Sequence, residues 1–175
     1  MKQLTMTEMA TEEKASRKPA AKVNVKTVMK IPQTRIALKE TGITYDIPPV
    51  SNRRELEKFF IDLNSEEAFE KFTILAVNSR CIPIAVYSIL GSLSEVSAYP
   101  RVVAAFSLMS NAHSVFFCHN HPGGTNRPSA EDISSTLQLQ RVLRGIDVNL
   151  LDHIIIADGN AYSMAAHGDV DFMRR

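Results

Sequence analysis

Residues 114–145 read SVFFCHNHPGGTNRPSAEDISSTLQLQRVLRG, and this stretch carries the strongest indication of the fold class. The apolar run SVFFCH is typical of a buried strand, and Pro122 with the Gly-rich loop behind it ends that strand. A cap at Ser129, acids in the first turn, bases in the last turn and a stop at Gly145 predict a helix over residues 130–144. A strand, a loop and a capped helix in this order indicate an α/β domain.

The segments before this stretch supply two more strands and two helices. Ser51 is expected to cap a helix whose apolar stripe is Leu56, Phe59, Phe60 and Leu63. Apolar runs at 71–77 and 81–90 predict a hairpin whose strands are covered on both faces. Pro100 begins a predicted helix that ends near Asn111 and buries Val102, Val103, Phe106 and Met109.

The segment after it completes a single domain over residues 51–175. Strands are expected at 148–157 and 161–164, joined by a turn at 158–160. A second cap at Ser65 is expected to start a short turn that ends near Glu70. The element order predicts an α/β fold with a mixed sheet packed between helices.

The N-terminal residues differ in character from this domain. Residues 1–30 lack an apolar period and are expected to form a disordered basic leader, and residues 31–50 a connecting segment with a candidate edge strand. Residues 1–35, the basic arm, carry a net charge of +5, against −4 for the remainder. Such an arm is a candidate for weak contact with nucleic acid, although single lysines without aromatic residues are more typical of a solvated tail.

Composition sets the class of protein. With 175 residues, 45% of them hydrophobic, the chain can build its own core without a structural metal or a disulfide framework. Cys81 and Cys118 lie in apolar runs and are expected to pack as free thiols, which fits a reducing compartment. No membrane-spanning run is present and the first residues lack the apolar core of a signal peptide, so we expect a cytoplasmic protein without a membrane partner.

Three residues of the opening stretch are candidate metal ligands. His119 and His121 stand two apart at the end of a strand, so their side chains point to the same face. Asp132, in the first turn of the following helix, can add a carboxylate oxygen to the same ion. Three protein ligands are typical of a catalytic zinc site that leaves a fourth position for water.

Each part of this pattern has another interpretation when taken alone. Ser129 and Asp132 stand in the relation of a capping box, and an isolated His-x-His is weak evidence. The tripeptide His-Asn-His is not the signature of the nucleases named for it, which draw those residues from separated positions. The joint spacing, His-x-His-Pro followed after six residues by Ser-x-x-Asp, is specific, because packing alone does not require it.

This joint pattern resembles the JAMM (JAB/MPN+) metallopeptidase family, and most closely its bacterial RadC-type branch. The resemblance covers about residues 50–172 and includes GSL (91–93), YPR (99–101), HNHPGG (119–124), LLDHIII (150–156) and YSM with a later Gly (162–168). It implies a JAB/MPN-like domain and a Zn²⁺ ion held by His119, His121 and Asp132. It also implies that Ser129 lies near the tetrahedral intermediate and that the upstream catalytic glutamate is Glu70.

The residues themselves support Glu70 without excluding its neighbours. A carboxylate beside zinc-bound water can take a proton and pass it to a leaving amine. Glu66 and Glu67 compete with Glu70 for this role, but they lie in a predicted first turn, where the helix dipole stabilises acids anyway. Ser129 is a candidate donor to the developing oxyanion, with helix capping as its alternative role.

The sequence does not assign a single role to the other polar residues of the domain. Asp152 and His153 either orient a zinc ligand or form a hydrogen-bonded core pair. Cys118 is expected to face away from the metal because it alternates with His119, and His113 and His167 are expected to be solvated.

RadC-like proteins commonly carry an acid where Val102 stands here. The first 50 residues also lack the Gly-based hairpins of the helix-hairpin-helix region that fuller members carry.

The leading functional hypothesis is a zinc-dependent hydrolase of amide or isopeptide bonds, acting on a protein or peptide. The alternative is an accessory module of DNA repair or DNA metabolism with a non-catalytic zinc site, supported by the family label and the basic arm. A deaminase is disfavoured because the pattern H-x-E followed by P-C-x-x-C is absent. The sequence does not identify a substrate.

Overall fold

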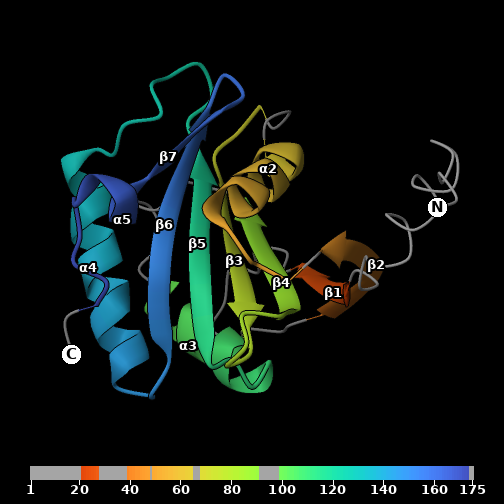
Figure 1. The fold of residues 1–175 in the computed structure, drawn as a ribbon. Helices are drawn as coiled ribbons and strands as arrows, with labels where there is room; N and C mark the ends of the chain where they lie inside the picture. The colour runs from red at the N-terminus through yellow and green to blue at the C-terminus, as the bar shows by residue number, and fades with distance from the viewer. Residues whose placement is uncertain (1–20, 28–38, 48, 65–67, 91–98, 174–175) are drawn as a thin grey trace, which may run out of the picture.

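Seven strands form one mixed sheet in the order β2-β1-β4-β3-β5-β6-β7 (Figure 1). The computed structural model describes residues 21–27, 39–47, 49–64, 68–90 and 99–173. In chain order, the elements are β1 (Ala21–Thr27), β2 (Lys39–Ile47), α2 (Arg53–Asn64), β3 (Lys71–Val77), β4 (Pro83–Leu90), α3 (Tyr99–Met109), β5 (Ser114–Asn120), α4 (Ala130–Arg144), β6 (Asn149–Ala157), β7 (Asn160–Ser163) and α5 (Met164–His167). The predicted α/β domain with a mixed sheet between helices is confirmed.

The sheet extends into the N-terminal segment. Strand β1 pairs in parallel with β4, and β2 pairs antiparallel with β1 at the sheet edge, which confirms the edge strand expected within residues 31–50. The prediction of a disordered leader is wrong for residues 21–27, because AKVNVKT alternates small or branched apolar residues with polar ones and the open edge of β4 offers it a ladder. The rest of the expected leader, 1–20 and 28–30, lies outside the described residues.

Helix α2 covers one face of the sheet. Its apolar stripe confirms the predicted period, with Leu56 and Phe60 fully buried and Phe59 and Leu63 partly buried. The cap is Asn52 and not Ser51, because the Asn52 side chain accepts the amide of Glu55 while Ser51 Oγ donates to the Glu55 carboxylate. Burying Leu56 and Phe60 contributes about 1.5–3 kcal/mol each to holding α2 on the sheet.

The opposite face is covered by α3 and α4. Val102, Val103 and Phe106 of α3 are buried in the core as predicted. Met109 was expected in this stripe but is 61% exposed, because α3 ends there and the chain turns at Asn111, whose φ is +53°. Helix α4 spans the predicted residues 130–144.

The β3–β4 hairpin is confirmed, and its turn explains one misplaced residue. Asn78 closes the turn by accepting the amides of Arg80 and Ile82 with its side-chain oxygen. Strand β4 therefore begins at Pro83, and Cys81 lies in the turn, half-buried and with φ of +55°, whereas the sequence placed it in a buried run.

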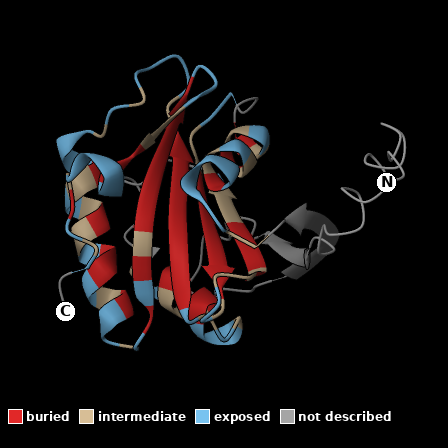
Figure 2. Ribbon diagram, viewed as in Figure 1, coloured by how far each residue is buried: buried red, intermediate tan, exposed pale blue. Residues whose placement is uncertain are grey.

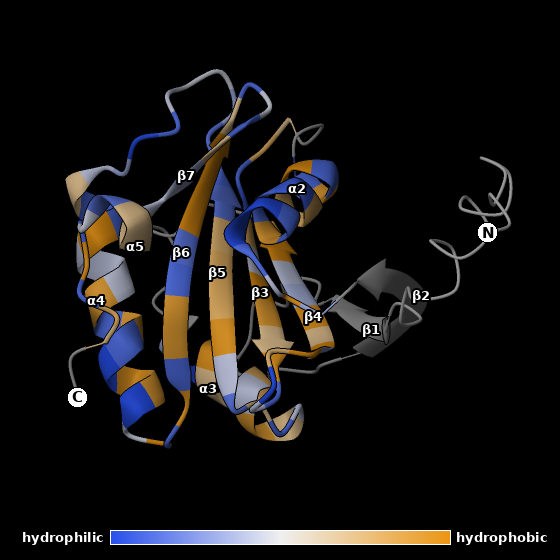
Figure 3. Cartoon of the chain, in the orientation of Figure 1, coloured by the Kyte–Doolittle hydropathy of each residue, from blue (hydrophilic) through white to orange (hydrophobic). Residues whose placement is uncertain are grey.

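The central strands are the most buried part of the molecule, as the red ribbons of β3, β5 and β6 in Figure 2 show. All seven residues of β5 are buried. Figure 3 shows that the polar residues of α2 lie on the side of the helix that faces away from the sheet. Strands β5 and β6 run in parallel with one irregularity, a bulge at Leu151 between the pairs Val115–Leu150 and Phe116–Asp152. Among the described residues, no helix is long and apolar enough to cross a membrane.

Candidate metal centre

The end of β5 and the start of α4 bring three candidate ligands together. His119 Nε2 lies 2.8 Å from His121 Nε2 and 3.2 Å from Asp132 Oδ1, and His121 Nε2 lies 3.4 Å from Asp132 Oδ2. Strand alternation brings the two imidazoles to one side, and the loop 122–128 returns the chain so that the first turn of α4 faces them. The juxtaposition predicted from the spacing is confirmed.

The chemistry of these donors fits a cation. His121 Nδ1 lies 2.7 Å from the Thr125 carbonyl oxygen, which can only accept, so Nδ1 carries the proton and Nε2 of the neutral ring carries a lone pair. This lone pair faces the His119 nitrogen at 2.8 Å beside a carboxylate. Two imidazole nitrogens and a carboxylate oxygen are the ligands that zinc accepts.

The electrostatics of the cluster agree with this interpretation. Burial alone would raise the pKa of Asp132, but hydrogen bonds from Ser129 and from the two imidazoles, which donate when they are protonated at Nε2, outweigh it and hold that pKa well below its usual range. The hydrogen bond to Asp132 raises the pKa of His121 against the effect of burial. The carboxylate is thus kept ionised, and the cluster favours a positive charge at the two Nε2 atoms, which either a proton or a metal cation can supply.

Ser129 is hydrogen bonded to Asp132. It is the N-cap of α4 and forms a full capping box: its Oγ accepts the Asp132 amide at 3.0 Å, while its own amide donates to Asp132 Oδ2 at 2.8 Å. The Ser129 hydroxyl also donates to Asp132 Oδ2 at 2.7 Å. The capping role is therefore present, and Ser129 also lines the pocket described next.

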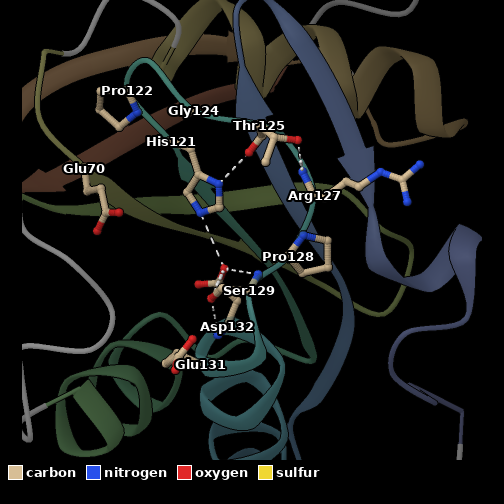
Figure 4. A pocket seen from close by; sticks show the side chains of 10 residues that line it. All are labelled: Glu70, His121, Pro122, Gly124, Thr125, Arg127, Pro128, Ser129, Glu131 and Asp132. Carbon is tan, nitrogen blue, oxygen red and sulfur yellow. Dashed lines mark hydrogen bonds and ion pairs between the residues drawn. The ribbon is translucent and has the colours of Figure 1, made fainter.

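A pocket of about 650 Å³ opens beside the ligands (Figure 4). Glu70 lies on one wall, with Ser129 and Asp132 on the other, and His121 is between them. The charge of Glu70 also contributes to the raised pKa of His121. Glu70 thus lines the same pocket as the candidate ligands His121 and Asp132. Glu66 and Glu67, its competitors, lie outside the described residues.

Asn120 holds the backbone on both sides of Glu70. Its side-chain oxygen accepts the amide of Lys71 at 2.7 Å, and its side-chain nitrogen donates to the carbonyl of Phe69 at 3.1 Å. Asn120 is only 4% exposed, and its carboxamide extends the β3–β5 pairing past the last paired residues, Phe72 and His119. Sequence reasoning missed this contact, because a lone asparagine between two histidines does not reveal which segment pairs with its strand.

The side chains of Asp152 and His153 do not pair with each other, because Asp152 Oδ1 accepts the backbone amide of His153 and not its ring. His153 faces α4, and its Nε2 lies 2.8 Å from His119 Nδ1. Asp152 faces the other side of the sheet, where it accepts hydrogen bonds from Ser163 Oγ and from the backbone amide of Ala165. Of the two interpretations left open, contact with a candidate ligand holds for His153, and a core position holds for Asp152.

The remaining predicted placements are confirmed. Cys118 is fully buried on the α2 side, away from the candidate ligands, with its Sγ 3.5 Å from the Asn64 side-chain nitrogen. Burial raises the pKa of the Cys118 thiol, which makes it an unreactive group. His113 and His167 are exposed, and the ring of His167 stacks on Tyr162.

Comparison with known proteins finds relatives that match most of the domain. A UPF0758 protein of Pseudomonas putida (strain W619) is 45% identical over 104 residues, which cover 58% of this chain and 46% of that protein. A UPF0758 protein of Janthinobacterium sp. (strain Marseille) is 34% identical over 154 residues, covering 86% of this chain and 66% of that protein.

The chain spans about half the length of the first of these relatives and of a UPF0758 protein of Pseudomonas entomophila (strain L48), of which 52% is covered at 39% identity over 122 residues. Residues 50–169 match the family model described as the RadC-like JAB domain, which is well over half of the 175 residues. On this match, with the strand, loop and helix that carry its histidines and aspartate, the chain belongs to the RadC-like JAB domain family.

Proposed function

We propose that this domain is a zinc-dependent hydrolase of amide or isopeptide bonds. The observation that supports it most is the convergence of the His119 and His121 nitrogens and the Asp132 carboxylate beside a pocket that also contains Glu70. These three residues would hold the ion. When bound, zinc supplies a Lewis acid that lowers the pKa of water and polarises a carbonyl group.

Glu70 is the proton carrier in this proposal. Its carboxylate lines the pocket near His121 without being part of the ligand cluster, which suits a group that takes a proton from the attacking water. The same carboxylate then delivers the proton to the departing nitrogen. The backbone on either side of Glu70 is held by the two hydrogen bonds of Asn120.

Ser129 is the proposed donor to the oxygen that gains charge during the reaction. Its hydroxyl lies at the pocket and donates to Asp132 in the absence of substrate. Rotation about one side-chain bond redirects that proton, while the backbone amide of Ser129 keeps its own bond to Asp132. One such donor is typically worth about 2.7–4 kcal/mol of transition-state stabilisation.

The substrate is proposed to be a protein or a peptide, because an open pocket beside the ligand cluster leaves room for an extended chain. The alternative, a DNA-metabolism module with a non-catalytic zinc, rests on the RadC resemblance and on the basic arm of residues 1–35, most of which lies outside the described residues. The experiment below separates the two hypotheses.

The test compares the zinc-loaded parent protein with Glu70→Gln on a library of quenched fluorescent peptides and lysine-linked isopeptides. We expect both proteins to contain zinc and the variant to be about 10²–10⁴-fold slower, because only the proton carrier is lost. Equal rates in the two proteins would contradict the role of Glu70. Zinc-loaded parent protein that cleaves no probe but binds duplex DNA with strong salt dependence would favour the accessory module.

A further inference from the structure

A chain of side-chain hydrogen bonds connects the candidate ligand His119 to helix α4. His119 Nδ1 lies 2.8 Å from His153 Nε2, and His153 Nδ1 lies 2.6 Å from Thr136 Oγ1. Thr136 Oγ1 in turn lies 2.6 Å from the backbone carbonyl oxygen of Asp132, one turn earlier in α4. We call Thr136 and His153 the relay. It joins two of the three candidate ligands through the protein interior.

The donors and acceptors of the relay fix where its protons lie. The Asp132 carbonyl can only accept, so it takes the single hydroxyl proton of Thr136. Thr136 Oγ1 then accepts from His153 Nδ1, which leaves a lone pair on Nε2 of the neutral His153 ring. That lone pair accepts the Nδ1 proton of His119, and the Nε2 atom of His119 is left unprotonated.

Packing holds the His153 ring in this orientation. The side chain is fully buried, with the Phe72 and Phe117 rings edge-on to it at centroid distances of 6.0 and 5.7 Å. No carboxylate among the described residues is hydrogen bonded to its imidazole, which favours the neutral ring that the proton assignment requires. His119 is itself 3% exposed, so water does not readily replace His153 as its partner.

We propose that Thr136 and His153 are positioning residues that set the tautomer and ring orientation of His119 and tie it to the backbone of Asp132. The inference rests on the proposed zinc site, since its consequence is a bare Nε2 atom directed at the ion. It goes further in naming the two residues that preorganise the ligands. It also explains why a hydroxyl residue, Thr136, is buried one turn after Asp132.

The first test reads the tautomers directly in the zinc-free parent protein by ¹⁵N-detected imidazole NMR. We expect His153 to carry its proton on Nδ1 and His119 to carry its proton on Nδ1, with both Nε2 atoms bare. Protonation of His153 at Nε2 would reverse the direction of the relay and overturn the proposal. This measurement requires neither substrate nor metal.

The second test measures zinc affinity by chelator competition in four variants. Thr136→Val keeps the side-chain shape and loses the hydroxyl, and Thr136→Ser is its matched control. His153→Phe extends the aromatic packing but removes both nitrogens, and His153→Gln restores an acceptor for His119. We expect about 10–100-fold weaker zinc binding in Thr136→Val and His153→Phe, and affinity near that of the parent protein in Thr136→Ser and His153→Gln.

The melting temperature of each zinc-free variant serves as the control for correct folding. If His153→Phe does not fold, the Thr136→Val and Thr136→Ser pair decides the question. Equal zinc affinity in folded Thr136→Val and in the parent protein would overturn the relay while leaving the zinc hydrolase intact. A parent protein that binds no zinc would overturn the proposed function, whereas the tautomer measurement would still judge the relay.

Discussion

Two buried aspartates, one on each face of the sheet, are equally exposed, but their pKa values are shifted in opposite directions. Asp132 and Asp152 are each 6% exposed. Hydrogen bonds from Ser129 and from the two imidazoles in their protonated form outweigh burial and lower the pKa of Asp132. Burial outweighs the neutral donors around Asp152, which are Ser163 and two backbone amides, and its pKa is raised.

The difference indicates which cluster suits a cation. The carboxylate of Asp152 has its acceptor positions filled by neutral donors that fix the start of α5, so this cluster is complete without a ligand. The carboxylate of Asp132 faces imidazole nitrogens that also face each other, and that cluster becomes electrostatically complete when a cation lies between them. Burial alone therefore does not mark a functional carboxylate.

The largest expected effect is the loss of zinc when the Asp132 cluster is changed, with no loss when the Asp152 cluster is changed. His119→Ala/His121→Ala removes two of the three donors, and we expect zinc to fall from about one ion per chain to about none. Asp152→Asn, the matched change in the second cluster, should keep zinc at the level of the parent protein. Mass spectrometry of the native proteins measures both. Zinc retained in the double variant would remove the basis of the comparison.

The next effect separates the two roles of Ser129. Ser129→Ala removes the hydroxyl at the pocket, and we expect about 10²–10³-fold slower cleavage of any probe that the parent protein hydrolyses. Loss of the cap should also lower the free energy of unfolding by about 1 kcal/mol. Ser129→Thr keeps the hydroxyl and should retain most of both. A variant that loses the stability but keeps the rate would show that Ser129 only caps α4.

A smaller effect is expected where Asn120 supports the zinc side of the comparison. Asn120→Ala leaves the Lys71 amide and the Phe69 carbonyl without this partner, and we expect a loss of about 1–3 kcal/mol in the free energy of unfolding. Cleavage should slow by up to about 100-fold because Glu70 shifts, while zinc content should stay the same. Amide hydrogen exchange at Lys71, compared between the variant and Asn120→Asp, tests this. Unchanged exchange in Asn120→Ala would contradict the role.

The smallest effect is a change in how stability depends on pH at Asp152. Because the folded pKa of Asp152 is raised, the native state binds this proton more tightly than the unfolded chain does, and its contribution is present at low pH. That contribution is lost as pH rises from the ordinary value of 3.8 through the raised folded pKa. The destabilisation caused by Asp152→Asn should therefore be larger near pH 4 than near pH 7.

Urea unfolding of the zinc-free protein measures this difference, with Asp62→Asn on the exposed side of α2 controlling for the loss of one carboxylate. The opposite trend, a penalty that grows with pH, would place Asp152 in the same electrostatic class as Asp132. The comparison between the two aspartates would then fail.

Local patterns predicted much of the fold and the ligand set. The bounds of α4 follow from its cap, its charges and Gly145, and the candidate ligands follow from strand alternation and the first turn of a helix. These signals lie within about 15 residues of sequence, so they need no knowledge of strand pairing. The predictions for Met109 and Ser51 were wrong because both residues lie at helix ends, and helix ends depend on a few backbone hydrogen bonds.

The contacts that support the site could not be predicted in this way. Asn120 reaches Phe69 and Lys71 only because β3 pairs with β5, and His153 reaches His119 only because β6 pairs with β5. Pairing register is a long-range property that alternation within one strand does not reveal. Thr136 carried a weak local signal, since it stands four residues after Asp132 on the same side of α4.

The bulge at Leu151 has a consequence for chemistry as well as for twist. In a regular register, Leu151 would pair with Phe116, and Asp152 would then lie beside Phe117 on the side of His119. His153 would lie beside Cys118, against α2. The extra residue in β6 thus assigns an imidazole to one face and a carboxylate to the other. A single step in the hydrogen-bond ladder determines whether His119 meets a neutral ring or a second negative charge.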